Sequence, residues 1–322
     1  MGTQPLDSRR SLSVAIVARD DEAVLADTLA NVRPWADEIV VLNVESSDRT
    51  AEIAAVFGAR VVKAAWKADY SAVRNHLFGV LAGEWVLWLE PGERVDDATW
   101  PDLRRLVDAA ADRDTAYGVT IEIPALPPSG SAEQAALIRL VPNRPELRFE
   151  GRVAETLKPS IQQAGMNTAL APGRILRHPR CHDVRWKSAR AWHTLDLVSL
   201  ENHVGRTPSL RVLMAMGDAA LDLEDRPLAR QAYSEVVRIA ARGSLEMLQG
   251  YYGMLATFGE DSGDADRQLA LCLEALEVFP LDAQLLCADA KGPLIFSSIW
   301  GLRISRLLLP RYMRKTASTR RI

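Results

Sequence analysis

The chain has 322 residues, of which 48% are hydrophobic and 25% are charged, and its formal net charge is -3. This composition is typical of a globular protein with room for two domains, and it lacks the basic excess that nucleic-acid binding requires. We therefore expect no nucleic-acid partner. The cysteines, Cys181, Cys272 and Cys287, are scattered and odd in number, which argues against a disulfide framework and for a reducing compartment.

The first strongly apolar run, Leu12 to Ala18, is too short for the core of a signal peptide or for a membrane span. We expect a cytoplasmic protein. The same run is rich in β-branched residues and predicts a strand.

Short apolar runs and segments with helical spacing alternate from Leu12 to Glu90, in the order βαβαβαβ. The predicted strands are Leu12–Ala18, Glu38–Asn43, Arg60–Ala64 and Glu84–Glu90. The predicted helices are 23–35, 51–59 and Ala68–Leu81. This order predicts a Rossmann-like, mostly parallel sheet with helices on both faces.

Polar side chains end or follow three of these strands, namely Arg19, Asn43, Glu45 and Glu90. A doubly wound sheet binds its ligand outside the carboxyl ends of its strands. We expect these side chains to meet at one edge of the sheet and to form the ligand site there.

The sequence changes character near residue 183. Before it, a helix over 100–111 and strands over 118–124 and 135–140 suit an acceptor-side subdomain. After it, no strand-like run remains, and Leu and Ala recur at helical spacing. We predict an α/β domain over residues 1–183 and an all-α helical domain over residues 184–322.

Two segments of the helical domain look like degenerate helix-turn-helix repeats. Leu213–Ile239 places Leu213, Gly217, Ala229 and Tyr233 at the offsets of the small and aromatic positions in a repeat of about 34 residues. Gly250–Pro280 matches less closely. Such TPR-like repeats usually form a concave groove for a protein or peptide, so they predict either a docking surface or a scaffold that covers the sheet.

Five blocks occur in a recognisable order. They are SVAIVARDD from Ser13, ESSDRT from Glu45, DYSAVRN from Asp69, GEWVLWLEPGE from Gly83 and FEGRVAE from Phe149. Together they resemble the family 2 glycosyltransferases with a GT-A fold, and in particular the bacterial subgroup in which a GT-A domain precedes TPR-like repeats.

The resemblance implies transfer of a sugar from a nucleoside diphosphate sugar to an acceptor, with inversion. The donor-binding residues carried by the matching blocks are Arg19, Asn43, Glu45, Asp48, Arg74, Asn75 and Glu90. A guanidinium forms bidentate bonds to phosphate, which favours Arg74 as a diphosphate contact. Asp48 equally suits a helix N-terminus, and Arg74 and Asn75 equally suit a helix cap.

The sequence departs from the family pattern at the residues that would bind a metal ion. These enzymes usually offset the charge of the leaving diphosphate with a divalent cation, Mg or Mn, held by an Asp-x-Asp motif. Glu90-Pro91-Gly92 stands in its place, so one carboxylate has become glycine. Glu90 and Glu93 remain as candidate ligands, and we expect a weak or absent dependence on metal.

The acceptor side has also changed. The histidine of the family's Gly-Arg-Ile-His-Glu element is replaced here by Ala154, which leaves Glu155 as the candidate general base.

Two functions stay open. The first is an active glycosyltransferase of the hexosyltransferase type, acting on a glycan or protein acceptor, and the second is an inactive relative that serves as a protein-interaction module.

Two further sequence features each have two interpretations. His178, Cys181 and His182 could bind zinc, but three candidates without a fourth favour an ordinary loop. The stretch from Arg303 onward has seven Lys or Arg and no acid. It predicts either peripheral contact with the anionic inner face of a membrane or a solvated tail.

Overall fold

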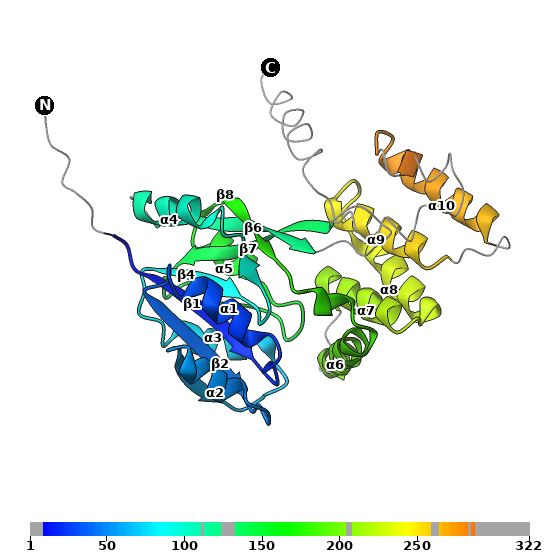
Figure 1. Ribbon diagram of the computed structural model, residues 1–322. Helices are drawn as coiled ribbons and strands as arrows, with labels where there is room; N and C mark the ends of the chain where they lie inside the picture. The colour runs from blue at the N-terminus through cyan, green and yellow to red at the C-terminus, as the bar shows by residue number, and fades with distance from the viewer. Residues whose placement is uncertain are drawn as a thin grey trace, which may run out of the picture.

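The computed structural model describes residues 9–110, 113–123, 133–203, 208–258, 264–282 and 285–286. An α/β domain is followed by a succession of helices on one side of it (Figure 1), which confirms the predicted fold class. The strands are β1 (Leu12–Ala18), β2 (Glu38–Val44), β3 (Arg60–Ala64), β4 (Trp85–Leu89), β5 (Arg94–Val95), β6 (Thr115–Ile123), β7 (Glu133–Pro142) and β8 (Asn167–Leu176). The helices of the α/β domain are α1 (Leu25–Val32), α2 (Thr50–Val56), α3 (Tyr70–Phe78), α4 (Trp100–Ala109) and α5 (Lys158–Gln163).

The strands form one sheet in the order β3-β2-β1-β4-β7-β6-β8-β5. β1, β2, β3 and β4 are mutually parallel, so their carboxyl ends share one edge. β7 runs antiparallel beside β4 with Leu140 opposite Leu87, which brings residue 139 to the same edge as Glu90. The sheet thus gathers residues from distant parts of the chain at its carboxyl edge.

Each face of the sheet has its own apolar core. α1, α2 and α4 pack on one face with Trp85 and Trp100, while α3 and α5 pack on the other with Trp88. Trp85 and Trp88 are both buried but belong to opposite cores. Residues three apart on a strand point to opposite faces, so the two layers follow from the sequence of β4 itself.

The predicted elements up to Leu89 are present with small differences in length. α3 begins at Tyr70 because the Asp69 carboxylate accepts the amide hydrogen of Ala72 at 3.0 Å, as an N-cap does. β5, β8 and α5 were not predicted. β8 contains Pro172 and Gly173, which normally interrupt strands, and they lie where the β6–β8 ladder changes register.

The helical domain starts with the long α6 (Val184–His203) and continues with α7 (Leu210–Asp222), α8 (Arg226–Ile239), α9 (Leu245–Ala256) and α10 (Ala265–Val278). A short 3-10 helix, η1 (Pro179–His182), precedes it. No helix among the described residues is long and apolar enough to cross a membrane. The basic stretch from Arg303 lies outside the described residues.

The repeats pack through one aromatic ring. Tyr233 of α8 is fully buried, and its hydroxyl donates to Asp218 of α7 at 2.7 Å. A Cβ atom built on Gly217 would lie 2.6 Å from this ring, and one built on Gly253 of α9 would lie 2.4 Å from it. Both glycines therefore make room for Tyr233, which explains the small residues found at these repeat positions.

We predict that Gly217→Ala lowers the free energy of unfolding by about 1–3 kcal/mol, the usual cost of overpacking a core. Helix propensity alone would favour alanine at this mid-helix position by about 0.5–1 kcal/mol, so the sign of the change separates the two effects. Chemical denaturation measures this change in the free energy of unfolding. Gly79→Ala is the control because its Cβ would meet nothing closer than 3.6 Å, and a Gly217→Ala variant as stable as this control would contradict the packing role.

Candidate functional site

Two loops at the carboxyl edge are joined by reciprocal hydrogen bonds. The loop after β1 contains Asp20 and Glu22, and the loop after β2 contains Ser47, Asp48 and Arg49. Asp20 accepts from the backbone amide of Ser47 at 2.7 Å, and Glu22 accepts from that of Arg49 at 3.0 Å. In return, Asp48 accepts from the backbone amide of Glu22 at 2.9 Å. The two loops therefore behave as one preformed unit.

Asp48 has a structural role in this unit. It also accepts from the backbone amide of Thr50 at 2.9 Å, at the start of α2. Partial burial would raise the pKa of Asp48, but its hydrogen bonds with Thr50 and Glu22 outweigh this and lower it. Its function as a donor contact stays a prediction.

Asn43 and Glu45 lie beside these loops at the end of β2. Asn43 is buried, and its Oδ1 accepts from the backbone amide of Ser46 at 3.3 Å. Its side-chain amide nitrogen has no hydrogen bond to another described residue. Glu45 is exposed with a positive φ of 53°, so it turns the chain away from the strand. The predicted contacts of Asn43 and Glu45 with the donor stay predictions.

Arg74 links the two sides of the predicted site. Its Nε donates to Glu155 Oε1 at 2.7 Å, and its NH2 group lies 3.5 Å from Glu90 Oε1. The guanidinium carbon lies 5.5 Å from the centre of the Trp88 ring and 5.3 Å from that of Phe149. Aromatic packing and two carboxylates thus fix this guanidinium beside Glu155 and Glu90, and its predicted contact with the diphosphate stays a prediction.

Asn75 holds the loop that carries Glu155. Its Nδ2 donates to the carbonyl of Phe149 at 2.9 Å, and its Oδ1 accepts from the amide of Phe149 at 2.7 Å. Both ends of the side-chain amide are therefore engaged by protein backbone. The structure places Asn75 under the site as a support, and its predicted contact with the donor stays a prediction.

A second group of ion pairs surrounds Glu90 and Glu93. Arg139 of β7 lies 2.9 Å from Glu93 Oε1, and Arg177, just after β8, lies 3.1 Å from the same oxygen. Arg139 also lies 3.6 Å from Glu90. Burial would raise the pKa of Glu90, but Arg139, Arg177 and Arg74 together hold it far below its usual value. Glu90 is ionised and its side chain is still 39% exposed.

The two predicted metal ligands do not form a metal pair. Glu93 is 1% exposed, its Oε1 binds two arginines, and its Oε2 accepts from the backbone amide of Glu90 at 2.9 Å. Only Glu90 keeps a carboxylate that reaches solvent. Across the described part of the chain, no cluster of three or more His, Cys, Asp and Glu could hold a metal ion. The residues present therefore do not fit a divalent cation in the manner of an Asp-x-Asp motif.

The position of the lost carboxylate is closed to a side chain. Gly92 has a positive φ of 87°, and a Cβ atom there would lie 2.9 Å from Cβ of His178 and 3.4 Å from Cβ of Val24. His178 itself accepts from the backbone amide of Arg180 through Nδ1 at 3.0 Å, as the N-cap of η1. The hypothesis that His178, Cys181 and His182 bind zinc gains no support, because no group of three or more potential metal ligands is found among the described residues.

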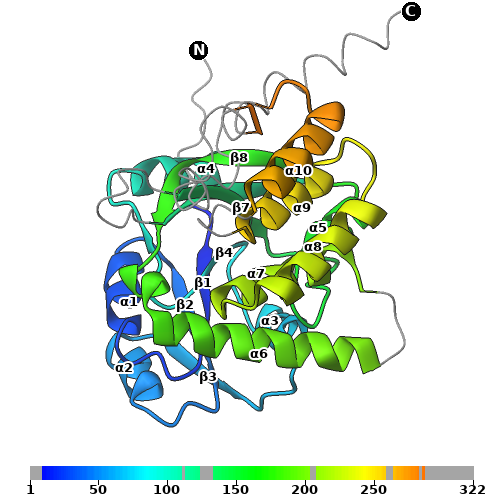
Figure 2. The same cartoon turned by 90° about the vertical axis from the view of Figure 1, so that its right-hand side faces the viewer.

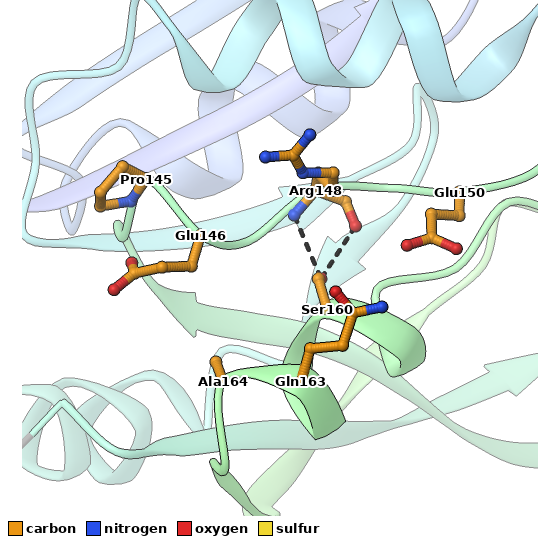
Figure 3. Close-up of a pocket in the computed structure, with 7 residues that line it drawn as sticks. All are labelled: Pro145, Glu146, Arg148, Glu150, Ser160, Gln163 and Ala164. Carbon is orange, nitrogen blue, oxygen red and sulfur yellow. Dashed lines mark hydrogen bonds between the residues drawn. The ribbon is translucent and has the colours of Figure 1, made fainter.

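Two cavities are lined by the segment that follows β7 together with residues of α5 or α3. One of about 490 Å³ is lined by residues around α5, where the Ser160 hydroxyl donates to the carbonyl of Arg148 at 2.9 Å and accepts from its amide at 3.1 Å (Figure 3). The other, of about 530 Å³, shares only Asn75 with the predicted site. Neither brings together the ionised groups found at the carboxyl edge, so we place the site at the carboxyl edge.

Arg139, Arg177 and the contacts of α6 with the α/β domain were not predicted from the sequence. Arg139 carried a signal, because it is a single charge within the apolar run of a predicted strand, and a buried charge there needs a partner. Arg177 follows β8, a strand that was not predicted. The contacts of α6 join it to distant segments, as His193 is joined to Trp66 and Tyr70 more than a hundred residues earlier, and no local pattern predicts them.

The comparisons with known proteins agree with this architecture. Residues 13–145 match the family described as glycosyl transferase family 2. A TPR repeat-containing protein of Synechococcus elongatus is 30% identical over 172 residues, which are 52% of this chain and 41% of that protein. An uncharacterized glycosyltransferase of Rickettsia typhi is 25% identical over 115 residues, which are 35% of this chain and 39% of that protein. The chain spans about two fifths of the length of these curated relatives.

Solved structures show weaker likeness. Glucosyl-3-phosphoglycerate synthase from Mycobacterium tuberculosis, in complex with Mn²⁺, UDP and glucosyl-3-phosphoglycerate, covers 36% of this chain and 44% of its own, at 20% identity and a TM-score of 0.29. TarS of S. aureus covers 87% of this chain and 88% of its own, at 11% identity and a TM-score of 0.39. Likeness at these TM-scores says nothing about the ligands of this chain.

We predict that Gly92→Asp does not restore a metal site. The change should lower the free energy of unfolding by about 1–3 kcal/mol, because it adds a side chain where φ is positive and His178 is close. Gly58→Asp is the control, since Gly58 has a similar φ of 80° but open space around it. Thermal unfolding with and without Mn²⁺ measures both effects. A Gly92→Asp variant that Mn²⁺ stabilises more than wild type would contradict this prediction.

The pH dependence of stability should report on Glu90. Because the folded-state pKa of Glu90 is lowered, its contribution is fully present above the unfolded value of about 4.3 and is lost as the pH falls below it. Glu90→Gln should therefore be less stable than wild type at pH 7, and the difference should shrink between about pH 5 and pH 2. Denaturant titrations across this range measure it, with the exposed Glu45→Gln as control. A difference that does not change with pH would contradict the ion-pair assignment.

Proposed function

We propose that this chain, whose residues 13–145 match glycosyl transferase family 2, moves a sugar from a nucleoside diphosphate sugar to an acceptor hydroxyl with inversion. The observation that carries the proposal is the Glu155 carboxylate, which Arg74 holds at 2.7 Å beside the partly exposed Glu90. These groups meet at the carboxyl edge of the sheet, the place where such folds bind ligands.

On the donor side, we assign nucleotide binding to the linked loops after β1 and β2. Asn43 presents a buried amide nitrogen that can donate to a carbonyl of the nucleobase. The ionised Glu90 can accept hydrogen bonds from sugar or ribose hydroxyls, since its side chain is partly exposed. Arg19, Glu45 and Asp48 belong to the same loops, so the donor meets a surface that hydrogen bonds have already fixed.

On the acceptor side, Glu155 serves as the general base. The acceptor oxygen attacks the anomeric carbon while the bond from that carbon to the diphosphate breaks, and the acceptor proton passes to the carboxylate. Among the described residues, the hydrogen bond from Arg74 engages only Oε1, which leaves Oε2 for the proton. A base positioned in this way contributes about 10²- to 10⁴-fold to a rate.

The acceptor itself is either a glycan or a protein. The helical domain supports docking of a protein, because TPR-like repeats form concave surfaces and a curated relative is described as a TPR repeat-containing protein. The lost metal ligand favours the second candidate, an inactive relative that uses the same surface as an interaction module.

A donor screen tests the proposal. Binding to the folded state alone raises its melting temperature, so a UDP-, GDP- or dTDP-sugar should stabilise the protein, and slow hydrolysis should follow. Glu155→Gln should keep donor stabilisation and lose turnover by about 100-fold or more.

The control is Glu150→Gln, which removes a carboxylate from the same loop without touching Arg74. Equal turnover by wild type and Glu155→Gln would overturn the assignment of the base. If no donor raises the melting temperature, the enzyme proposal fails and the interaction module stands.

A further inference from the structure

The ion-pair network at the site carries no net charge. It contains the guanidinium groups of Arg74, Arg139 and Arg177 and the carboxylates of Glu90, Glu93 and Glu155. Three positive charges thus face three negative ones. Cleavage of the donor leaves extra negative charge on the diphosphate, and this network brings no net positive charge to offset it.

Two other arginines lie at this edge without such neutralisation. Arg19 directly follows β1, and Arg190 lies on α6. Both are exposed, and neither forms an ion pair with a carboxylate of the described chain. By contrast, Arg180 nearby is paired with Asp21 at 2.6 Å. The guanidinium carbon of Arg190 lies 5.4 Å from the centre of the Trp186 ring. Neither Arg19 nor Arg190 donates a side-chain hydrogen bond to a described residue, so their donor groups can meet an anionic ligand.

The position of α6 is fixed by contacts with the α/β domain (Figure 2). The ring of His193 lies 5.3 Å from that of Trp66 and 5.8 Å from that of Tyr70. One turn further along the helix, Leu197 packs against Val153, in the loop that carries Glu155.

Glu201 completes this interface. It accepts from the backbone amide of Arg152 at 3.3 Å. Arg190, His193, Leu197 and Glu201 follow one another at intervals of three or four residues, which places them along one face of α6. Arg190 thus projects from the face of α6 that is turned to the site.

The electrostatic effects of the two arginines agree with this placement. The pKa of Glu90 is lowered by Arg139, Arg177 and Arg74 against the effect of burial, and Arg190 adds to the lowering. Burial lowers the pKa of His193, and Arg19 lowers it further. Asp196 acts on His193 in the opposite direction. Both cations therefore act on groups at the junction of the two domains.

We propose that Arg19 from the α/β domain and Arg190 from α6 form a clamp for the donor diphosphate. Two guanidinium groups bring the two positive charges that a divalent cation would bring, and each can bind phosphate oxygens in a bidentate manner. The helical domain then forms one wall of the active site, in addition to any role in docking. This inference rests on the proposed function, because it assumes a nucleoside diphosphate at the carboxyl edge.

The test compares nucleotide binding by calorimetry in the full-length protein. UDP, GDP and dTDP are screened first, and the one that binds wild type best is then compared with its monophosphate. Arg19→Ala and Arg190→Ala should each weaken diphosphate binding by about tenfold or more, as expected for loss of a charged hydrogen-bonding partner. Binding of the monophosphate should change much less, so the preference for diphosphate should shrink.

The matched control is Arg185→Ala, which removes the same charge from an exposed position on the same helix. It should bind diphosphate as wild type does. If Arg190→Ala binds diphosphate within about twofold of this control, the clamp is overturned while the proposed function survives. If wild type binds none of the three diphosphates, the proposed function itself fails, and the clamp fails with it.

Discussion

The arrangement of the site depends on the ion pair between Arg74 and Glu155. This contact joins α3, which follows the third strand, to a loop more than seventy residues later, and it sets Glu155, the proposed base, beside Glu90. A buried guanidinium is costly unless carboxylates and hydrogen bonds compensate it. Trp88, Phe149, Glu90 and Glu155 provide that compensation together, so loss of any one would disturb the geometry of the others.

The packing and the ion pairs around Gly92 and Glu93 explain why the lost metal ligand cannot simply be replaced. Around Gly92 the chain has a backbone conformation that favours glycine, and His178 occupies the space of a side chain. Glu93 has become an internal counterion for Arg139 and Arg177. The strand end where the family pattern has its Asp-x-Asp motif is here part of a network of protein ion pairs, and we propose that arginine side chains supply the positive charge.

Much of the fold could be predicted from the sequence because its signals are local. The alternation of strands and helices to Glu90 and the small residues around Tyr233 both follow from short-range patterns. The roles of individual site residues were harder to predict. Asp48 and Asn75 match the family blocks, yet their side chains bind backbone groups of neighbouring loops. Whether a polar side chain faces a ligand or supports a loop depends on distant partners, as the contacts of Arg139 and α6 also show.

The central claim is that the protein offsets the charge of its donor with its own cations. The most direct measurement is the dissociation constant of the preferred nucleoside diphosphate, first after exhaustive chelation with EDTA and then with saturating Mn²⁺. The account predicts clear binding in EDTA and a change of less than about twofold on addition of Mn²⁺. Binding that appears only when Mn²⁺ is present would contradict it.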